Sequence, residues 1–194
     1  MARKVEFNPD VAVDEATSLF WHNGYTNTAL RQLLSAMGIG EGSFYNTFKS
    51  KQNLYLLCLK HYNETVGQRR LDALLGGVTA KESVRAFFKV ILDELDDPAT
   101  PRVCMLAGSV TSDVLSVPDL KDEVIPGLEE LGRNFTETLE AGKRSGELPV
   151  DFQPEIASQI ISTFLHGMFR VLGVTQTRVQ MEKQIEMLLQ GIGL

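Results

Sequence analysis

The segment from Gly24 to Lys51 constrains the fold more than any other part of the chain, because it predicts two short helices joined by a glycine turn. Its first apolar residues recur at i, i+3, i+4 and i+7, which places them on one face of a helix: Leu30, Leu33, Leu34 and Met37. Thr28 precedes this stripe, where its hydroxyl is predicted to cap the first free N–H groups. Gly38 follows the stripe and can adopt the left-handed conformation that ends a helix.

A second short helix is predicted to begin near Glu41. Its apolar residues, together with Ile39 in the turn, are expected to point into the core: Phe44 and Phe48. Small polar side chains remain on the outer face: Ser43, Tyr45, Asn46 and Thr47. In a helix-turn-helix the second helix enters the major groove of DNA with its N-terminal end. Residues 29–48 therefore predict a DNA-binding helix-turn-helix.

Several ordered blocks at fixed spacing give this segment a family resemblance. They are Gly24-Tyr25, Thr28-Ala29-Leu30, Gly38-Ile39, Gly42-Ser43-Phe44-Tyr45, Phe48 and Lys49-Ser50-Lys51. The chain resembles the tetracycline-repressor (TetR) family of bacterial regulators over about residues 8–62. The resemblance implies an all-α fold, operator DNA as a partner, and phosphate contacts from Thr28, Tyr45 and Lys51.

The expected DNA contacts come from both helices and from the residue that follows Ser50. Ser43 and Asn46 are short and polar and can reach base edges, and an Asn side chain suits the paired donor and acceptor of adenine. Gly42 lets the helix backbone come close to the groove. Glu41 can accept from a cytosine amino group or can simply favour the start of the helix. The full expected set is Thr28, Ala29, Glu41, Gly42, Ser43, Tyr45, Asn46 and Lys51.

The distribution of charge along the chain agrees with a DNA-binding N-terminal head. The 194 residues have a net charge of −6. Residues 1–60 carry six Lys/Arg and five Asp/Glu, a net charge of +1, and residues 61–194 carry 13 and 20, a net charge of −7. The acidic residues are therefore expected in the part that does not face DNA. A charge of +1 allows only a few phosphate contacts per subunit.

The remaining helix signals predict an all-α chain of nine helices. Asn8-Pro9, Ser50, Thr79-to-Glu82 and Thr177-to-Gln180 are helix starts with a capping side chain. The helix from Ser50 is expected to run towards Gly76, and another short helix to span about 103–115. Pro126 can kink the long helix that ends at Gly146 or delay its start. We expect a three-helix DNA-binding domain in residues 1–50 and a ligand-binding and dimerisation domain in 51–194.

By resemblance, the C-terminal domain is expected to hold a pocket for a small-molecule effector. Aromatic and flexible apolar side chains suited to a pocket are Phe87, Phe88, Cys104, Met105, Phe164 and Met168. The same residues at helical spacing also fit plain core. Some relatives use a cysteine in the region of Cys104 to sense oxidants, although Val103 replaces the glycine they have before it. Cys104 is therefore either a sensor or a buried packing residue.

These features lead to one expected function and several alternatives. The expectation is a cytoplasmic bacterial repressor that binds a palindromic operator as a homodimer, through the apolar helices at about 153–174 and 178–191, and is released by an effector. The alternatives are a sensor acting through Cys104 and an all-helical interaction protein without DNA affinity. No enzyme motif, cofactor or metal-ligand spacing is found, and neither an apolar run long enough to span a membrane nor a signal peptide is found.

Overall fold

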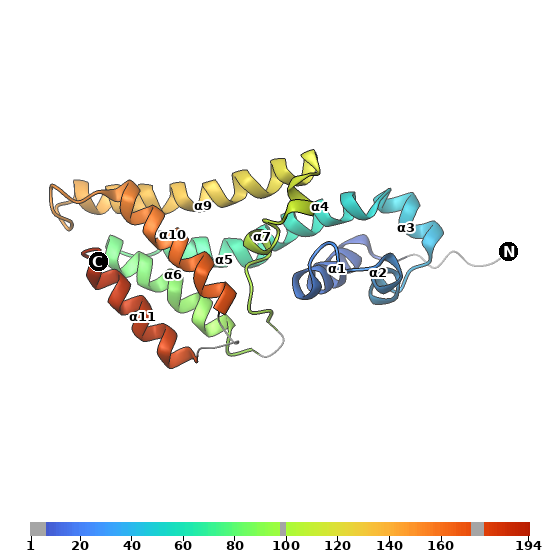
Figure 1. Ribbon diagram of the computed structural model, residues 1–194, viewed down its shortest axis with the longest axis horizontal. Helices are drawn as coiled ribbons and strands as arrows, with labels where there is room; N and C mark the ends of the chain where they lie inside the picture. The colour runs from blue at the N-terminus through green and yellow to red at the C-terminus, as the bar shows by residue number, and fades with distance from the viewer. Residues whose placement is uncertain (1–6, 98–99, 172–176) are drawn as a thin grey trace. The chain divides into compact units, whose positions relative to one another are not determined.

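The computed structural model describes residues 7–97, 100–171 and 177–194, and it confirms the all-α fold class (Figure 1). The described part of the chain contains eleven α-helices and one π-helical turn, where nine helices were expected, because two expected helices are subdivided. The elements are α1 (Pro9–Asn23), α2 (Leu30–Met37), α3 (Glu41–Phe48), α4 (Lys51–Tyr62), η1 (Asn63–Gly67), α5 (Gln68–Leu75), α6 (Ala80–Glu94), α7 (Met105–Gly108), α8 (Ser112–Leu115), α9 (Pro118–Arg144), α10 (Pro154–Val171) and α11 (Arg178–Gly191).

Capping side chains account for where four of the helices begin: α1, α4, α6 and α11. The Asn8 side chain accepts from the Asp10 N–H (2.9 Å), and Ser50 accepts from the Asn53 N–H (3.0 Å). The two predicted capping boxes form at the starts of α6 and α11. Pro126 lies inside α9, which already begins at Pro118, so the proline does not delay the start of this helix. The end of the helix expected at 153–174 lies partly outside the described residues.

The first of two compact units comprises residues up to Thr65 together with Met105–Ile125. In it α1 packs against α2 and α4, and α4 also contacts α3 and α7. Aromatic side chains form much of its core: the Phe20 and Tyr55 rings lie 4.8 Å apart, and Trp21 meets Tyr62 at 4.9 Å. The Tyr55 hydroxyl shares a buried hydrogen bond of 2.6 Å with Ser109 Oγ. This bond ties α4 to the segment that contains α7.

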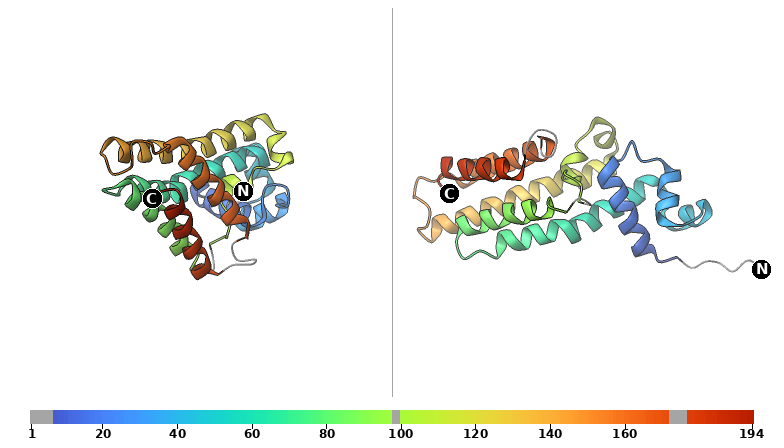
Figure 2. Two further views of the ribbon diagram at one scale, coloured as in Figure 1. Left: turned by 60° about the vertical axis from the view of Figure 1, so that its left-hand side comes forward. Right: turned by 90° about the horizontal axis from the view of Figure 1, so that it is seen from below.

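The second unit comprises the described residues of Val66–Cys104 and Pro126–Leu194. Here α6 packs against α5, and Figure 2 shows α11 lying alongside α6. The rings of Phe87 and Phe135 meet at 4.9 Å in the core. Arg70 is buried, forms a 2.7 Å ion pair with Glu94, and places its guanidinium 5.4 Å from the centre of the Phe169 ring. A charged pair thus sits within the apolar interior with both partners satisfied.

A long-range cap holds the start of α6. Glu147, which follows α9, accepts from the backbone N–H groups of Ala80 (2.7 Å) and Lys81 (2.9 Å). Gly142 permits this close approach, because a Cβ at that position would lie 2.6 Å from the Ala80 Cβ. The absent side chain of Gly142 therefore lets α9 pack directly against the first turn of α6.

The two units do not by themselves locate a domain boundary. The chain passes from the first unit to the second within η1 and again within α9. The expected division at residue 50 therefore stays a prediction. Among the described residues, no helix is both long and apolar enough to cross a membrane.

Candidate functional site

The turn between α2 and α3 has the geometry that the sequence predicts. Gly38 adopts φ 66° and ψ 29°, and the Ile39 N–H bonds back to the Leu34 carbonyl at 3.1 Å. This left-handed residue ends α2, and Gly40 becomes the N-cap of α3. The apolar residues turned inward are Leu33, Met37, Phe44 and Phe48, which are buried, while Leu30, Leu34 and Ile39 are half-buried. The helix-turn-helix is therefore formed as expected.

The outer face of α3 is available to a partner. Gly42, Tyr45, Asn46 and Thr47 are exposed, and Ser43 is half-buried. The glycine is not required by the packing of the protein, since a Cβ at Gly42 would meet no atom within 4 Å. Glu41 is also exposed, in the first turn of the helix. The backbone at Gly42, which has no side chain, is therefore exposed on the same helix as Tyr45 and Asn46.

The start of α2 corrects one prediction. The N-cap is Ala29, not Thr28, and the backbone N–H of Ala29 donates to the side-chain oxygen of Gln32 (2.7 Å). Thr28 is fully buried, and its hydroxyl donates to the Gly24 carbonyl at 2.7 Å. In this conformation Thr28 offers no surface to DNA, whereas Ala29 is exposed. Because the Thr28 hydroxyl is buried and bonded to the Gly24 carbonyl, it does not cap α2 as expected.

Lys51, the first residue of α4, is folded onto the head. Its ammonium lies 4.5 Å from the centre of the Tyr25 ring, a cation–π arrangement. Burial lowers the pKa of Lys51, and the negative charge of Asp113 opposes this effect. A side chain expected to bind phosphate is therefore already engaged within the first unit.

Lys49 is a further candidate for the site that the expected set does not include. It is exposed directly after α3, has a positive φ of 66°, and its ammonium donates to the Asn46 carbonyl at 2.6 Å. Its presence in the Lys49-Ser50-Lys51 block was the available signal. The pattern could not show that this lysine lies at the exposed end of α3 while Lys51 turns inward.

The charge of the first unit also differs from the expectation. Counted over residues 1–65 and 105–125, it holds seven Lys/Arg and ten Asp/Glu, a net charge of −3. Four of the acids come from the later segment: Asp113, Asp119, Asp122 and Glu123. Folding therefore returns this acidic segment to the unit that contains the helix-turn-helix, which a count along the chain does not show, and whether these residues face DNA stays a prediction.

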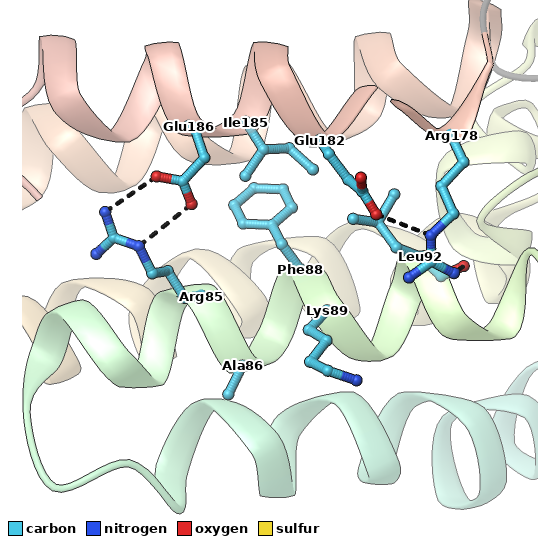
Figure 3. Close-up of a pocket in the computed structure, with 9 residues that line it drawn as sticks. All are labelled: Arg85, Ala86, Phe88, Lys89, Leu92, Arg178, Glu182, Ile185 and Glu186. Carbon is cyan, nitrogen blue, oxygen red and sulfur yellow. Dashed lines mark hydrogen bonds and ion pairs between the residues drawn. The ribbon is translucent and has the colours of Figure 1, made fainter. Parts of the chain in front are cut away.

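The structure places most of the six expected effector residues in the interior. Phe87, Phe88, Cys104, Met105 and Met168 are buried and Phe164 is half-buried. Met105 belongs to the first unit and the other five to the second. Phe88 lines a groove of about 340 Å³ between α6 and α11 (Figure 3). Ion pairs border this groove, Arg85 with Glu186 at 3.3 Å and Arg178 with Glu182 at 2.8 Å.

Two polar side chains on α10 stand out in the second unit. Ser162 Oγ and His166 Nε2 are shielded from solvent and have no hydrogen-bond partner among the described residues. They lie one helical turn apart, and burial lowers the pKa of His166. Buried polar atoms of this kind are normally satisfied by water or a ligand. Neither residue belongs to the pocket set expected from the sequence.

The two cysteines are free and buried. Burial raises the pKa of Cys58 to about 12, and its thiol donates weakly to the Val13 carbonyl at 3.8 Å. Cys58 therefore packs as an inert thiol. Cys104 is 8% exposed. Across the described residues, no group of three or more His, Cys, Asp or Glu is arranged to hold a metal ion.

Comparison with known proteins places this geometry in a family. Residues 12–58 match the family described as "Bacterial regulatory proteins, tetR family". The chain is 29% identical over 148 residues to the uncharacterized HTH-type transcriptional regulator YezE of Bacillus subtilis, covering 76% of each protein. It is 24% identical over 163 residues to the HTH-type transcriptional repressor ComR of Escherichia coli, covering 84% of this chain and 78% of ComR.

A solved structure extends the similarity over the whole chain. A cysteine mutant of the TetR family transcriptional regulator CifR, complexed with 26-bp double-strand operator DNA, is 27% identical and superposes with a TM-score of 0.89. The match covers 97% of this chain and 98% of that one. These relatives are transcriptional regulators and not enzymes. The chain belongs to the TetR family of bacterial transcriptional regulators.

Proposed function

We propose that the protein is a transcriptional repressor that binds operator DNA as a homodimer and is released by a small-molecule effector. The observation that carries this proposal is the outward face of α3, where Gly42, Tyr45 and Asn46 are exposed and the packing of the protein does not require the glycine. The complex of CifR with operator DNA, which matches almost the whole chain, supports the binding of operator DNA. The protein would act in the bacterial cytoplasm, where its DNA is.

Each exposed side chain of α3 has a distinct proposed role. Asn46 reads a base edge, and Gly42 lets the helix backbone enter the groove. Tyr45 contacts a phosphate and so positions the helix without specifying sequence. Ser43 is half-buried and can reach a base or a phosphate near the start of the helix. Ala29, Glu41 and Lys51 are proposed to lie at the edge of the interface, and Thr28 acts from inside by supporting the Gly24 turn.

Gel-shift titrations with the DNA upstream of the gene test these roles. Tyr45→Ala should weaken binding to the upstream duplex and to a scrambled duplex by a similar factor. Asn46→Ala should weaken binding to the upstream duplex about 5- to 150-fold while leaving the scrambled duplex unchanged. Gln68→Ala, which removes an exposed amide from α5, is the control. Equal losses on both duplexes for Asn46→Ala would contradict base recognition, and wild-type protein that ignores every duplex would favour the interaction-protein alternative.

An exposed apolar stripe on α10 supports the homodimer. Ile156, Ile160 and Val171 lie at helical spacing on one face and are exposed, and Gly167 continues the stripe. On α11, Val179 and Met187 are also exposed. A second copy would bury this surface, and two-fold symmetry would match a palindromic operator. Ile160→Glu should shift the mass measured by light scattering from dimer to monomer, whereas Val78→Glu, at a position 95% exposed, should not.

The effector is proposed to bind inside the second unit, beside α10. Ser162 and His166 present a hydroxyl and an imidazole whose shielded atoms lack partners within the described part of the chain. Because burial lowers the pKa of His166, the imidazole is neutral at pH 7 and suits an uncharged polar group of the ligand. An effector found by a thermal-shift screen should raise the Tm of the wild type, and His166→Phe should abolish that rise without loss of DNA binding. A rise that persists in His166→Phe would place the effector elsewhere.

The effector acts by differential affinity for two arrangements of the protein. A ligand that prefers an arrangement unable to bind both half-sites lowers DNA affinity by its preference for that arrangement. The burial of Cys104 favours such a reversible ligand over direct attack on the thiol. Sensing through Cys104 remains the alternative that a substitution can test.

A further inference from the structure

The segment Met105–Ile125 is bonded at three points within the first unit, twice to α4 and once to the connection between α1 and α2. Tyr55 on α4 shares a buried hydrogen bond with Ser109 (2.6 Å), and the Gln52 amide donates to Asp119 (2.9 Å). The third point is at α8, where the Thr26 hydroxyl donates to the carboxylate of Asp113. Thr26 lies two residues before Thr28, in the connection between α1 and α2. The segment thus reaches the edge of the helix-turn-helix.

Asp113 also acts on Lys51. The Lys51 ammonium sits over the Tyr25 ring at 4.5 Å, and that ring packs in turn against Tyr55 at 4.8 Å. Asp113 attracts Lys51 and opposes the fall in its pKa that burial causes, and its charge adds to the burial that raises the pKa of Tyr25. Asp113 also accepts from Thr111, which is the main reason why its own pKa is lowered. One carboxylate therefore accepts a hydrogen bond from Thr26 and attracts the Lys51 ammonium.

We propose that Asp113 competes with a DNA phosphate for Lys51 and Thr26, and so limits how tightly the head binds DNA. Lys51 is held on Tyr25 beside a carboxylate, and it gains a phosphate only by giving up that interaction. The net charge of −3 on the first unit makes a single carboxylate matter, since few cations there are available to a phosphate. This inference rests on the proposed DNA binding, which the wild-type protein tests separately.

Fluorescence anisotropy with the upstream duplex and a scrambled duplex, each titrated at several salt concentrations, measures the effect. Asp113→Asn should bind both duplexes about three- to tenfold more tightly at low salt, because phosphate repulsion falls and Lys51 is released. The slope of log affinity against log salt should steepen by up to about 0.9, the value for one added phosphate contact. Loss of a merely structural contact would not steepen this slope.

Matched variants separate the proposal from a general effect of charge. Asp119→Asn removes the same charge from the same segment, but Asp119 is bonded to Gln52 rather than facing Lys51, so it should raise affinity less than Asp113→Asn. In a Lys51→Met background the gain from Asp113→Asn should shrink to the gain from Asp119→Asn. Asp113→Ser, checked by its melting curve, serves if the Asn variant is unstable.

Four outcomes would overturn the inference. Weaker binding by Asp113→Asn with an unchanged salt slope would make Asp113 a structural support of the head. Equal gains for Asp113→Asn and Asp119→Asn would reduce the effect to net charge. Wild-type protein that binds no duplex would remove the proposed function and this inference with it, whereas wild-type binding without any effect of Asp113→Asn removes the inference alone.

Discussion

Gly142→Ala and Gly132→Ala place the same methyl group at two positions of α9 and should change stability in opposite directions. At Gly142 the new Cβ would lie 2.6 Å from the Ala80 Cβ, and 3.2 Å from Glu147 Oε2 and from Leu148 Cδ1. Methyl carbons rest at about 3.5–4.0 Å, so α6 and α9 must separate by about 1 Å. The contacted atom is fixed to the backbone of α6 and cannot rotate away.

The expected magnitudes follow from these contacts. Overpacking costs about 1–3 kcal/mol, and separation also strains the two bonds from Glu147 to the start of α6. A gain in helix propensity of up to about 1 kcal/mol offsets part of this cost. Gly142→Ala should therefore destabilise by about 1–2 kcal/mol and lower the Tm by roughly 3–8 °C. At Gly132 a Cβ meets no atom within 4 Å, so the propensity gain of about 0.5–1 kcal/mol should raise the Tm.

Thermal unfolding followed by circular dichroism measures both variants at one fixed protomer concentration, since the stability of a dimer depends on concentration. The sign of the difference is the test. If both substitutions raise the Tm by similar amounts, α9 does not pack against the first turn of α6 as closely as the structure has it.

Arg70→Gln should cost on the order of 3 kcal/mol in urea denaturation, because Glu94 loses a buried partner, whereas Arg69→Gln, at a side chain 64% exposed, should cost under about 1 kcal/mol. Equal losses of stability for the two variants would show that burial of the Arg70 side chain does not strengthen its ion pair with Glu94. Hydrogen bonds from Arg178, and then from Lys89, lower the pKa of Asp93, so its contribution is present at neutral pH and is lost as the pH falls. The Tm difference between wild type and Asp93→Asn should accordingly be largest near pH 7 and shrink below about pH 4, and a difference independent of pH would refute it. Cys104→Ser should leave release from DNA by hydrogen peroxide unchanged if the thiol only packs, and should abolish that release if it is the sensor.

Helix starts whose signal lies within three residues could be predicted from the sequence. Asn8, Ser50, Thr79 and Thr177 each cap the helix that follows, since the acceptor and the backbone N–H groups are neighbours in the chain. Gly38 was predictable for the same reason, because only a glycine adopts the left-handed conformation there without strain.

Thr28 shows where a local signal fails. Thr28 and Ala29 are adjacent candidates for the N-cap of α2. In the structure the N-cap is Ala29, which has no acceptor in its side chain. Gln32 supplies the missing hydrogen bond from within the helix, and the Thr28 hydroxyl turns to the Gly24 carbonyl. Which neighbour is buried depends on the packing of α1 and α2, and a capping pattern does not contain that information.

Contacts across long stretches of sequence were equally out of reach. Glu147 caps α6 from 66 and 67 residues away, and no spacing in the chain marks the pair. The apolar positions between Ser50 and Gly76 predict a single helix. The structure instead has α4, the π-helical turn η1 and α5 there, and the apolar pattern does not mark the π-helical turn. Ser162 was missed because a lone serine in an apolar helix gives no signal until its neighbours are known.

The charge of the head depends on the fold in the same way. Counting along the chain puts Asp113 with the acidic C-terminal part, where it would have no bearing on DNA. In the folded protein Asp113 bonds to Thr26 and attracts Lys51. The positive charge of Lys51, which the count along the chain assigns to DNA binding, is therefore partly offset by Asp113. With the proposed roles of α3 and Asp113, general attraction to phosphate contributes little, and we expect most of the affinity to come from the fit of α3 to particular bases. We also expect any movement of α8 that takes Asp113 away from Lys51 to change binding to all sequences at once.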